Sequence, residues 1–440
     1  MAESAWLEGA SGDLNGEALT APLLEWKKGL PEDLREVCNR IATAGGGVWL
    51  VGGSVREAML GNPWNDLDLT TTLNPDEMLD LFPRAIATGV QFGTVTVRTA
   101  DSETQFEITT LRSEGTYGDG RRPDEVTFGD SLNEDLSRRD FTINAMAIDL
   151  ARNIIHDPYG GVEDLENQCL KAVGVAEERL GEDGLRLLRA YRFMDRGERG
   201  VWQPNSELSK ALLTCGHMLE NVSEERVWSE FRRVLSGLNA SVILERMRKD
   251  GMLSRILPGW DAEIDLQYLL KVPEKNGFAC RLVLLASEIP NERWRRIEHD
   301  LRALKLSNQD RNLVMDLHRL LGHLPAEVSE YRRYRYSVGD LIESHLAIED
   351  VLNPLEVGTV RETLASLAPL KAGDEPLVDG HLLSSTSDLS AGRRLGRLKE
   401  WLFNIQIEQD LDNPDDVLAL LDVLDWENTD PEFWPDSNWP

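Results

Sequence analysis

Apolar residues in the first part of the chain recur at the two-residue spacing that is typical of β-strands. Residues 48–51 form a short apolar run, which predicts a buried strand between glycine-rich segments. Strands with one covered face, or short strands beside them, are predicted over residues 66–70, 94–98, 105–110, 145–150 and 153–156. Helical spacing predicts helices over residues 31–44, 55–60 and 75–81. These elements together indicate an α+β domain with a small mixed β-sheet that ends near residue 175.

Strand patterns almost disappear after residue 175, and apolar residues then recur every three or four positions. This spacing predicts helices over residues 185–193, 208–213, 224–235 and 241–248, with further helices to about residue 423. The pattern divides the chain into a disordered N-terminal tail, an α+β head, and an all-helical neck, body and tail: residues 1–23, 24–175, 176–240, 241–325 and 326–440. The last residues, 430–440, are predicted to form a loose acidic tail.

Composition places the chain among soluble globular proteins. Of its 440 residues, 41% are hydrophobic and 28% are charged. No run approaches the roughly 18 apolar residues that a membrane helix needs, and the N-terminus lacks the basic start and apolar core of a signal peptide. The four cysteines are far apart and have no CxxC spacing, as in proteins of a reducing compartment. We therefore expect a cytoplasmic protein with no membrane partner, whose oligomeric state the sequence leaves open.

The formal net charge of −30 disfavours binding to nucleic acid over the whole surface, because phosphates attract Lys and Arg. The charge is unevenly distributed, however. Residues 401–440 contain eleven Asp and Glu and no Lys or Arg, whereas residues 182–233 carry eight arginines from Arg186 to Arg233. A local basic groove on an otherwise acidic protein is consistent with this distribution, and most of the acidic surface serves solubility.

A glycine pair followed by two aspartates is the first motif that carries chemistry. Gly52 and Gly53 separate a predicted strand from a predicted helix, so backbone N–H groups can approach an anion closely. Asp66 and Asp68 are two apart on a predicted strand and point to the same side, which suits Mg²⁺. Glu107, on a neighbouring predicted strand, could supply a third carboxylate. A lone DxD is usually solvated surface, but GGSVR with DLDL at this spacing predicts a nucleoside triphosphate held over two metal ions.

Five motifs in order resemble those of the class II tRNA nucleotidyltransferase and bacterial poly(A) polymerase family. They are LVGGSVREAMLG with NDLDLTT, RRDFTINA at residues 138–145, DPYGG at 157–161, and EDGLR at 182–186. Their order and spacing match from about residue 48 to residue 235. The resemblance implies a nucleotidyltransferase head with helical neck, body and tail, a Mg²⁺ cofactor, CTP and ATP as substrates, and the 3′ acceptor end of tRNA as partner.

The resemblance also assigns roles residue by residue. It makes Asp66 and Asp68 the metal ligands and catalytic residues, and it matches Asp140 to the residue that senses the ribose 2′-OH. Asp183 and Arg186 match the pair that reads the base. The other positions expected to contact the nucleotide are Gly52, Gly53, Arg56, Arg139, Asn144, Arg189 and Arg192. DPYGG is expected to be a turn between head and neck rather than a catalytic motif.

The chemistry of Asp183 and Arg186 agrees with base reading. A carboxylate only accepts hydrogen bonds and a guanidinium only donates them. Cytosine and adenine both present an amino donor beside a ring-nitrogen acceptor, whereas uracil and guanine present the reverse. On a helix, residues three apart share a face, so the pair would select C and A without a nucleic-acid template. Taken alone, the pair would be interpreted as a common Asp–Arg surface pair.

The sequence therefore favours addition of CCA to tRNA 3′ ends, by two-metal phosphoryl transfer with release of pyrophosphate. A-only addition is the first alternative. Residues 112–123 resemble the flexible loop of CCA-adding and A-adding members, which CC-adding members have shortened. Polyadenylation is less favoured because the C-terminus is acidic rather than basic. A non-catalytic RNA-binding relative would lack a metal ligand or the base-reading pair, and an enzyme acting on antibiotics would not need Asp183, Arg186 or the helical body.

Overall fold

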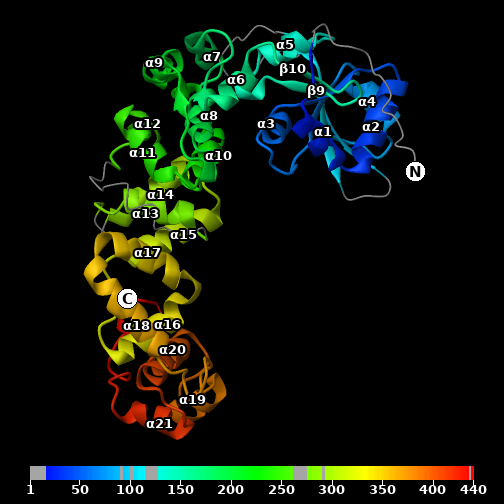
Figure 1. The fold of residues 1–440 in the computed structure, drawn as a ribbon. Helices are drawn as coiled ribbons and strands as arrows, with labels where there is room; N and C mark the ends of the chain where they lie inside the picture. Colours follow the sequence, from blue (N-terminus) through cyan, green and yellow to red (C-terminus); the bar gives the residue numbers. More distant parts are fainter. Residues whose placement is uncertain are drawn as a thin grey trace. The chain divides into compact units, whose positions relative to one another are not determined.

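The computed structural model describes residues 16–89, 93–99, 104–113, 127–260, 275–289, 293–435 and 438–440. The chain forms two compact units, Met1–Ile256 and Leu257–Pro440. Figure 1 shows the strands of the first unit in blue to cyan and the helices that follow them in green. The α+β head with a helical remainder is as the sequence predicted. Most of the loop at residues 112–123 lies outside the described residues, as does the N-terminal tail up to residue 15.

The first unit is built on an eight-stranded mixed sheet in the order β1-β10-β9-β2-β3-β6-β5-β4. Only β3 and β6 are parallel among its neighbouring pairs. The strands are β1 (Glu17–Ala18), β2 (Val48–Val51), β3 (Asp68–Thr71), β4 (Ile86–Gly89), β5 (Thr94–Arg98), β6 (Gln105–Thr110), β9 (Ala147–Asp149) and β10 (Ile154–His156). Two short pairs complete the strands, β7 (Arg112–Ser113) with β8 (Thr127–Phe128) and β11 (Cys169–Leu170) with β12 (Gln203–Pro204).

Local sequence determines the central strands well. The observed bounds of β2, β5 and β6 coincide with the predicted ranges, since these strands bury alternate or continuous apolar residues such as Trp49, Val95 and Ile108. The two edge strands, β1 and β4, were not predicted. β1 has two residues, too few to show alternation, and β4 is largely exposed, so neither carries a hydrophobic pattern.

The prediction of a disordered tail through Leu23 is wrong for residues 16–23. β1 pairs with β10, and α1 (Ala21–Lys28) follows directly. Leu19 and Leu23 are buried, and the Lys27 Nζ donates to the carbonyl oxygen of Leu150 at 2.6 Å. The contacts that order this segment come from residues about 130 positions later, so the local sequence could not reveal them.

The helices of the first unit alternate with the strands in the first part of the chain and then follow one another with few strands between them. They are α2 (Glu32–Thr43), α3 (Gly53–Met59), α4 (Pro75–Leu81), α5 (Leu132–Ser137), α6 (Gly161–Glu166), α7 (Ala176–Glu182), α8 (Leu185–Met194), α9 (Ser206–Thr214), α10 (Glu224–Leu235), α11 (Ala240–Lys249) and α12 (Met252–Ile256). α8 and α10 pack against each other, and both face the site described below. The DPYGG segment is a turn: the Asp157 carboxylate accepts hydrogen bonds from the backbone N–H groups of Gly161 and Val162, at the start of α6.

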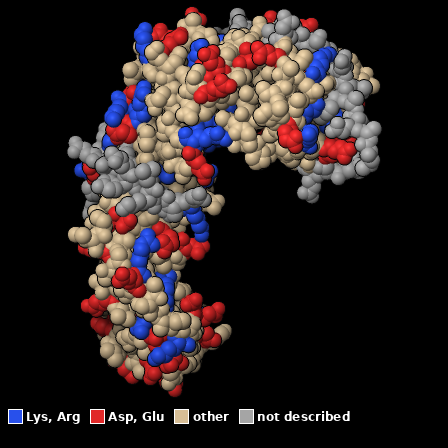
Figure 2. Space-filling view, viewed as in Figure 1, with Lys and Arg blue, Asp and Glu red and all other residues tan. Residues whose placement is uncertain are grey.

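The second unit is helical in its described residues. Its helices are α13 (Gly277–Leu285), α14 (Trp294–Ala303), α15 (Asn308–Arg319), α16 (Val328–Val338), α17 (Ile342–Leu352), α18 (Pro354–Ser366), α19 (Gly380–Ser387), α20 (Arg393–Gln409) and α21 (Pro414–Ala419). No helix among the described residues is both long and apolar enough to cross a membrane. Charged side chains of both signs are interspersed on the face shown in Figure 2.

The expected loose acidic tail at residues 430–440 is, in its described residues, packed onto the second unit. Trp434 and Trp439 are buried. The Trp439 indole N–H donates to the carbonyl oxygen of His323 at 2.7 Å, and its ring meets that of Tyr334 edge to face at 5.5 Å. The acidic composition of the segment gave no sign of this packing, which relies on the two tryptophans.

Candidate active site

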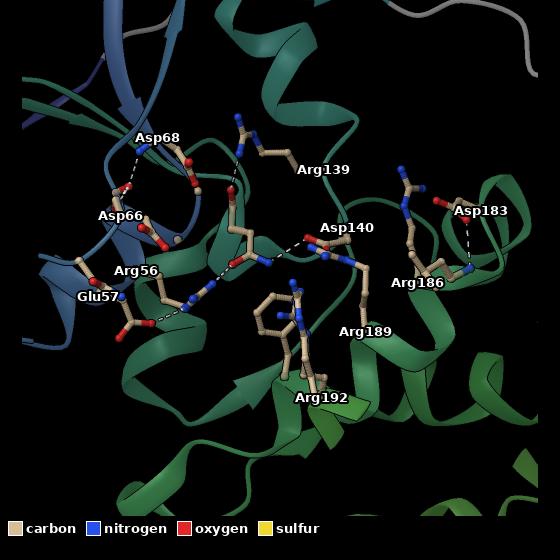
Figure 3. Close-up of a pocket in the computed structure, with 18 of the residues that line it drawn as sticks. Arg56, Glu57, Asp66, Asp68, Arg139, Asp140, Asp183, Arg186, Arg189 and Arg192 are labelled. Atoms are coloured by element: carbon tan, nitrogen blue, oxygen red, sulfur yellow. Dashed lines mark hydrogen bonds and ion pairs between the residues drawn. The ribbon is translucent and has the colours of Figure 1, made fainter. Parts of the chain in front are cut away.

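One cavity of about 690 Å³ in the first unit brings together almost every residue that the sequence singled out. The predicted residues that line it are Gly52, Gly53, Arg56, Asp66, Asp68, Arg139, Asp140, Asn144, Asp183, Arg186, Arg189 and Arg192. Figure 3 shows Asp66 and Asp68 at one end, Asp183 and Arg186 at the other, and Arg139 and Asp140 between them. This volume lies within the range of about 300–1,000 Å³ that small-molecule sites usually have.

A serine that the sequence analysis missed fixes the two aspartates. The sequence predicted that both aspartates lie in the strand. β3 begins at Asp68, however, so Asp66 lies in the segment before it. The Ser54 hydroxyl, on α3, donates to the carbonyl oxygen of Asp66 at 3.0 Å and accepts from the backbone N–H of Asp68 at 2.9 Å. The turn that presents both carboxylates is therefore tied directly to the helix that follows the glycine pair.

Glu107 lies beside Asp68 but does not line the main cavity. In the parallel pair of β3 and β6, Asp68 and Glu107 are directly opposite each other. Glu107 faces a second, smaller cavity of about 290 Å³, which shares Asp68 and Arg139 with the main one. Burial, followed by repulsion from Glu107, raises the pKa of Asp68 above its ordinary value, against the attraction of Arg139.

The glycine pair leaves the floor of the cavity open. Gly52 has a φ of +66°, a conformation that favours glycine. A Cβ at this position would come within 3.0 Å of the Arg139 Nη1 and 4.0 Å of the Asp68 Oδ2. A side chain at this position would thus come close to both the arginine and the aspartate.

A continuous chain of polar contacts runs along the middle of the cavity. Arg56 donates to the amide oxygen of Asn144, and the Asn144 amide nitrogen donates to the Asp140 Oδ1 at 2.9 Å. The Asp140 Oδ2 accepts from the Arg189 Nε at 2.7 Å. Burial alone would raise the pKa of Asp140, but the charge of Arg189 and the hydrogen bonds from Asn144 and Arg189 lower it below the ordinary value. Asp140 is therefore held as a carboxylate.

A buried glutamate on α10, missed by the sequence analysis, positions two of the arginines. Glu230 lies 2.8 Å from the Arg192 Nε and 3.7 Å from the Arg189 Nη1. The guanidinium of Arg192 also stacks over the Phe193 ring, 4.3 Å from its centroid. Burial and the neighbouring Arg189 lower the pKa of Arg192 to about 10, so the side chain remains a cation at neutral pH.

The predicted base-reading pair is arranged differently from the expectation. Asp183 follows α7 in an extended conformation and α8 begins at Leu185, so Asp183 and Arg186 do not share one helix face. The Asp183 carboxylate accepts from the backbone N–H of Leu185 at 3.0 Å and from Arg226 of α10 at 2.7 Å. Both residues still line the same end of the cavity, which is the property that base reading requires.

Arg186 is held by its own set of acceptors. Its guanidinium donates to the carbonyl oxygens of Arg179 at 2.7 Å and Arg138 at 2.9 Å, and to the Glu182 carboxylate at 2.5 Å. A guanidinium has five N–H donors, so these bonds fix its orientation and still leave donors for a ligand. The guanidinium of Arg186 is thus held in place by protein groups alone.

The residues around Asp66 and Asp68 fit a metal ion only in part. In the described ranges, no group of three or more His, Cys, Asp or Glu side chains gathers closely enough to hold one. The carboxylates of Glu107 and Asp66 nevertheless repel the charge of Asp68, against the attraction of Arg139 and Arg56, and a divalent cation would relieve that repulsion. Mg²⁺ commonly binds through one or two carboxylates together with water and substrate phosphates. The donor set suits a metal that arrives with a nucleotide.

Several other cavity residues escaped the sequence analysis. Glu57, Trp64, Asn65, Phe193, Arg226 and Arg233 all line the cavity. Arg226 and Arg233 belong to the basic run noted in the sequence, and their helical spacing placed them on α10. Only the packing of α10 against α8 directs them into the cavity.

Comparison with known proteins agrees with this geometry. The family described as "Poly A polymerase head domain" matches residues 48–171, and that described as "Probable RNA and SrmB- binding site of polymerase A" matches residues 203–264. A CCA-adding enzyme of Enterococcus faecalis is 34% identical over 413 residues, which cover 88% of this chain and 95% of that protein. The chain belongs to the class II CCA-adding enzyme family. It is a tRNA nucleotidyltransferase.

Further members of the family are similar over most of their length. A CCA-adding enzyme of Streptococcus pneumoniae is 37% identical over 340 residues, covering 74% of this chain and 79% of that protein. The crystal structure of the Bacillus stearothermophilus CCA-adding enzyme in complex with CTP matches with a TM-score of 0.68 and 26% identity, over 92% of this chain and 98% of that one. The fold is also that of the Thermotoga maritima CCA-adding enzyme complexed with tRNA, with a TM-score of 0.67 and 18% identity.

Proposed function

We propose that this family member adds CCA to the 3′ end of tRNA from CTP and ATP, without a nucleic-acid template. The observation that carries the proposal is that one cavity holds a pair of aspartates suited to Mg²⁺ at one end and a fixed Asp–Arg pair at the other. The CTP complex of the similar Bacillus stearothermophilus enzyme supports this choice of ligand.

The aspartates define the reacting end. Asp66 and Asp68 would hold Mg²⁺, which when bound neutralises charge on the triphosphate and lowers the pKa of the attacking 3′-OH. Gly52 and Gly53 leave room for the phosphates, and Arg56 and Arg139 supply positive charge there. The 3′ oxygen bonds to the α-phosphorus while the bond to the β-phosphate breaks and pyrophosphate leaves. These protein groups mainly position the reactants and stabilise the transition state.

The Asp183 and Arg186 side chains define the base-reading end. Each carboxylate oxygen of Asp183 already accepts one hydrogen bond, and each has a second lone pair for the amino group of C or A. Arg186 would donate to the adjacent ring nitrogen. Because both side chains are held by protein partners, a uracil or guanine would meet like groups, donor against donor and acceptor against acceptor. Discrimination by fixed polar groups of this kind is strong.

Asp140 and the arginines of α8 hold the middle of the nucleotide. Asp140, kept charged by Arg189, would accept a hydrogen bond from the ribose 2′-OH, and Arg189 and Arg192 would contact the phosphates or the base. The expected acceptor is the 3′ end of tRNA. The cytoplasmic location and the domain boundaries remain predictions from the sequence.

Incorporation on three tRNA ends tests the proposal. The protein would be incubated with tRNA lacking CCA, tRNA ending in C and tRNA ending in CC, with each of the four labelled nucleotides in turn and with Mg²⁺ or EDTA. We expect CTP to be added to the first two, ATP only to the third, and nothing in EDTA. ATP addition without CTP addition would identify an A-adding enzyme, long A tails would identify a poly(A) polymerase, and no incorporation would refute catalysis.

A further inference from the structure

The loop that carries Asp66 lies between α3 and β3 and comprises residues 60–66; we call it the Asp66 loop. Asp66 itself is exposed. The Ser54 hydroxyl holds the backbone carbonyl of Asp66 and not its carboxylate. The position of the carboxylate therefore depends on the course of the backbone through the loop.

Two tryptophans join the Asp66 loop to the N-terminal segment, residues 16–29. The Trp26 indole N–H, on α1, donates to the carbonyl oxygen of Asn62 in the loop at 2.9 Å. In the opposite direction, the Trp64 indole N–H donates from the loop to the carbonyl oxygen of Gly29, just after α1, at 2.8 Å. Carbonyl groups in loops and beyond helix ends lack the partners that regular secondary structure supplies, and an indole N–H can take that place.

The N-terminal segment is itself fixed to the sheet, so it can support the loop. β1 pairs with β10, and Leu19 and Leu23 are buried. The Lys27 Nζ donates to the carbonyl oxygen of Leu150 at 2.6 Å and to the Asn153 Oδ1 at 2.8 Å. α1 also contacts α3, the helix that precedes the loop, and Figure 1 shows the two side by side.

The beginning of the Asp66 loop is held from two further directions. The Arg199 guanidinium, from the turn after α8, donates to the carbonyl oxygen of Leu60 at 2.7 Å. The Asn62 side-chain amide donates to the Glu57 carboxylate of α3 at 2.6 Å. Trp64 extends this support toward Asp66, because it ties the middle of the loop to the N-terminal segment.

Trp26 acts on the site at one remove. Trp64 and Asp66 line the main cavity, whereas Trp26 is not among the described residues that do. Trp26 also lies outside residues 48–171, the range that matches the head-domain family, and Trp64 lies inside it. A change at Trp26 therefore reaches the cavity through the loop, which makes it the cleaner of the two positions to test.

We propose that residues 16–29 are a positioning element of the active site, in which Trp26 and Trp64 fix the Asp66 loop so that the Asp66 carboxylate meets the metal ion. The apparent affinity for a ligand falls by the fraction of molecules in which the binding-competent arrangement is populated. The two indole hydrogen bonds raise that fraction before metal and nucleotide arrive. The assignment rests on the proposed function, in which Asp66 and Asp68 hold Mg²⁺ together with the nucleotide.

Titration of CTP without tRNA separates metal binding from catalysis. Each protein would be titrated by calorimetry in Mg²⁺ and in EDTA, where only the contacts between protein and nucleotide remain. Trp26→Phe keeps an aromatic ring and removes the N–H donor. We expect its Kd for CTP in Mg²⁺ to rise about three- to tenfold, the range of one neutral hydrogen bond, and its Kd in EDTA to stay within about twofold of the parent value.

Two further variants complete the comparison. Trp64→Phe should raise the Kd for CTP in Mg²⁺ by a similar factor, and it decides the matter if Trp26→Phe does not fold, because Trp64 is 36% exposed. Trp426→Phe is the matched control. It removes an indole hydrogen bond of the same kind, to the carbonyl oxygen of Leu421 at 3.1 Å in the second unit, and it should change neither Kd.

Amide hydrogen exchange provides a readout that needs neither metal nor nucleotide. Exchange reports local opening, so the Asp66 loop should exchange faster in Trp26→Phe than in the parent. Exchange in β2 and β6 should match the parent in the same sample, and Trp426→Phe should leave the loop unchanged. Agreement of faster loop exchange with weaker CTP binding in Mg²⁺ alone is the result that a general loss of stability would not produce.

An unchanged Kd for CTP in Mg²⁺, an equal rise in Mg²⁺ and in EDTA, or unchanged exchange of the loop would each overturn the positioning role. The proposed function is judged separately, by addition to the three tRNA ends. It fails if the parent protein adds no nucleotide to any of them. The positioning role fails if the parent is active and Mg²⁺ strengthens CTP binding to the parent and to Trp26→Phe by the same factor.

Discussion

The carboxylate of Asp183 accepts a 2.7 Å hydrogen bond from Arg226, which lies 43 residues further along the chain. This contact joins the segment between α7 and α8 to α10. It holds one oxygen of Asp183, while the backbone N–H of Leu185 holds the other. The carboxylate of Asp183 is thus positioned by a residue outside the motif that contains it.

The first prediction concerns Arg226. Arg226→Ala should loosen Asp183 and reduce the preference for CTP and ATP over UTP and GTP by about tenfold, since one charge-assisted hydrogen bond contributes about 1.5–3 kcal/mol. Incorporation of each nucleotide, one at a time, measures the preference. Arg232→Ala is the matched control, because Arg232 lies on the same helix and is exposed outside the cavity. An Arg226 variant as selective as the parent would show that Asp183 does not need this partner.

The second prediction concerns base reading itself. Asp183→Ala should reduce CTP and ATP use and raise the relative use of UTP and GTP, because the wrong bases no longer meet an acceptor. A fixed polar group left without its partner costs about 1–3 kcal/mol. The same four-nucleotide assay, on tRNA lacking CCA and on tRNA ending in CC, measures this change. Continued sharp rejection of UTP and GTP would mean that the base is read elsewhere.

The third prediction concerns Asp68 and a metal ion. Asp68→Asn should reduce CTP and ATP incorporation by about three orders of magnitude or more, since metal ligation contributes several kcal/mol to the transition state. In EDTA the same variant should be at least as thermally stable as the parent, because the substitution removes repulsion with Glu107. Mg²⁺ with a nucleotide should raise the melting temperature of the parent more than that of the variant.

The pH dependence of that difference has a definite sign. The pKa of Asp68 is raised in the folded protein, so the folded state binds this proton more tightly than the unfolded state does. The proton on Asp68 therefore stabilises the folded protein below the ordinary aspartate pKa. This stabilisation is lost as the pH rises through the raised pKa of Asp68. In EDTA, the advantage of Asp68→Asn over the parent should therefore shrink as the pH is lowered toward the ordinary aspartate range. A stability difference between Asp68→Asn and the parent that widens toward low pH would contradict a raised pKa for Asp68.

The fourth prediction concerns the buried pair of Asp140 and Arg189. Asp140→Ala leaves Arg189 without its nearest carboxylate, and breaking such a pair costs about 3–5 kcal/mol when the charges are fully buried. Arg189 is 29% exposed and also lies near Glu230, so we expect a loss at or below the low end of that range. The loss in the free energy of unfolding is measured by chemical denaturation, from the unfolding transition of the first unit. Equal stability of variant and parent would contradict the role of the pair.

The fifth prediction concerns the C-terminus. Trp439→Ala should destabilise the second unit by about 3–5 kcal/mol, because it removes a buried ring and its hydrogen bond to His323. Phe433→Ala is the control, since Phe433 is 86% exposed. Thermal unfolding of the two variants compares them. If both variants melt like the parent, the C-terminal segment does not contribute to the fold.

The sequence alone determined the central strands and the composition of the site. β2, β5 and β6 could be placed because a strand in a half-covered sheet repeats every two residues, and that repeat is local. The GGSVR and DLDL segments and the arginines of α8 could be recognised because each motif consists of residues that are close together in the sequence. Twelve of the thirteen predicted site residues therefore line one cavity.

Tertiary structure decided what those residues contact. Glu107 faces the smaller cavity because the register of β6 against β3 directs it there. Asp183 pairs with Arg226, and Arg192 with Glu230, because α8 and α10 pack together. β1 and Trp439 are ordered by partners more than 100 residues away. The spacing of residues within a segment indicates only which of them share a face of a helix or strand. Contacts between distant segments are decided by how those elements pack together.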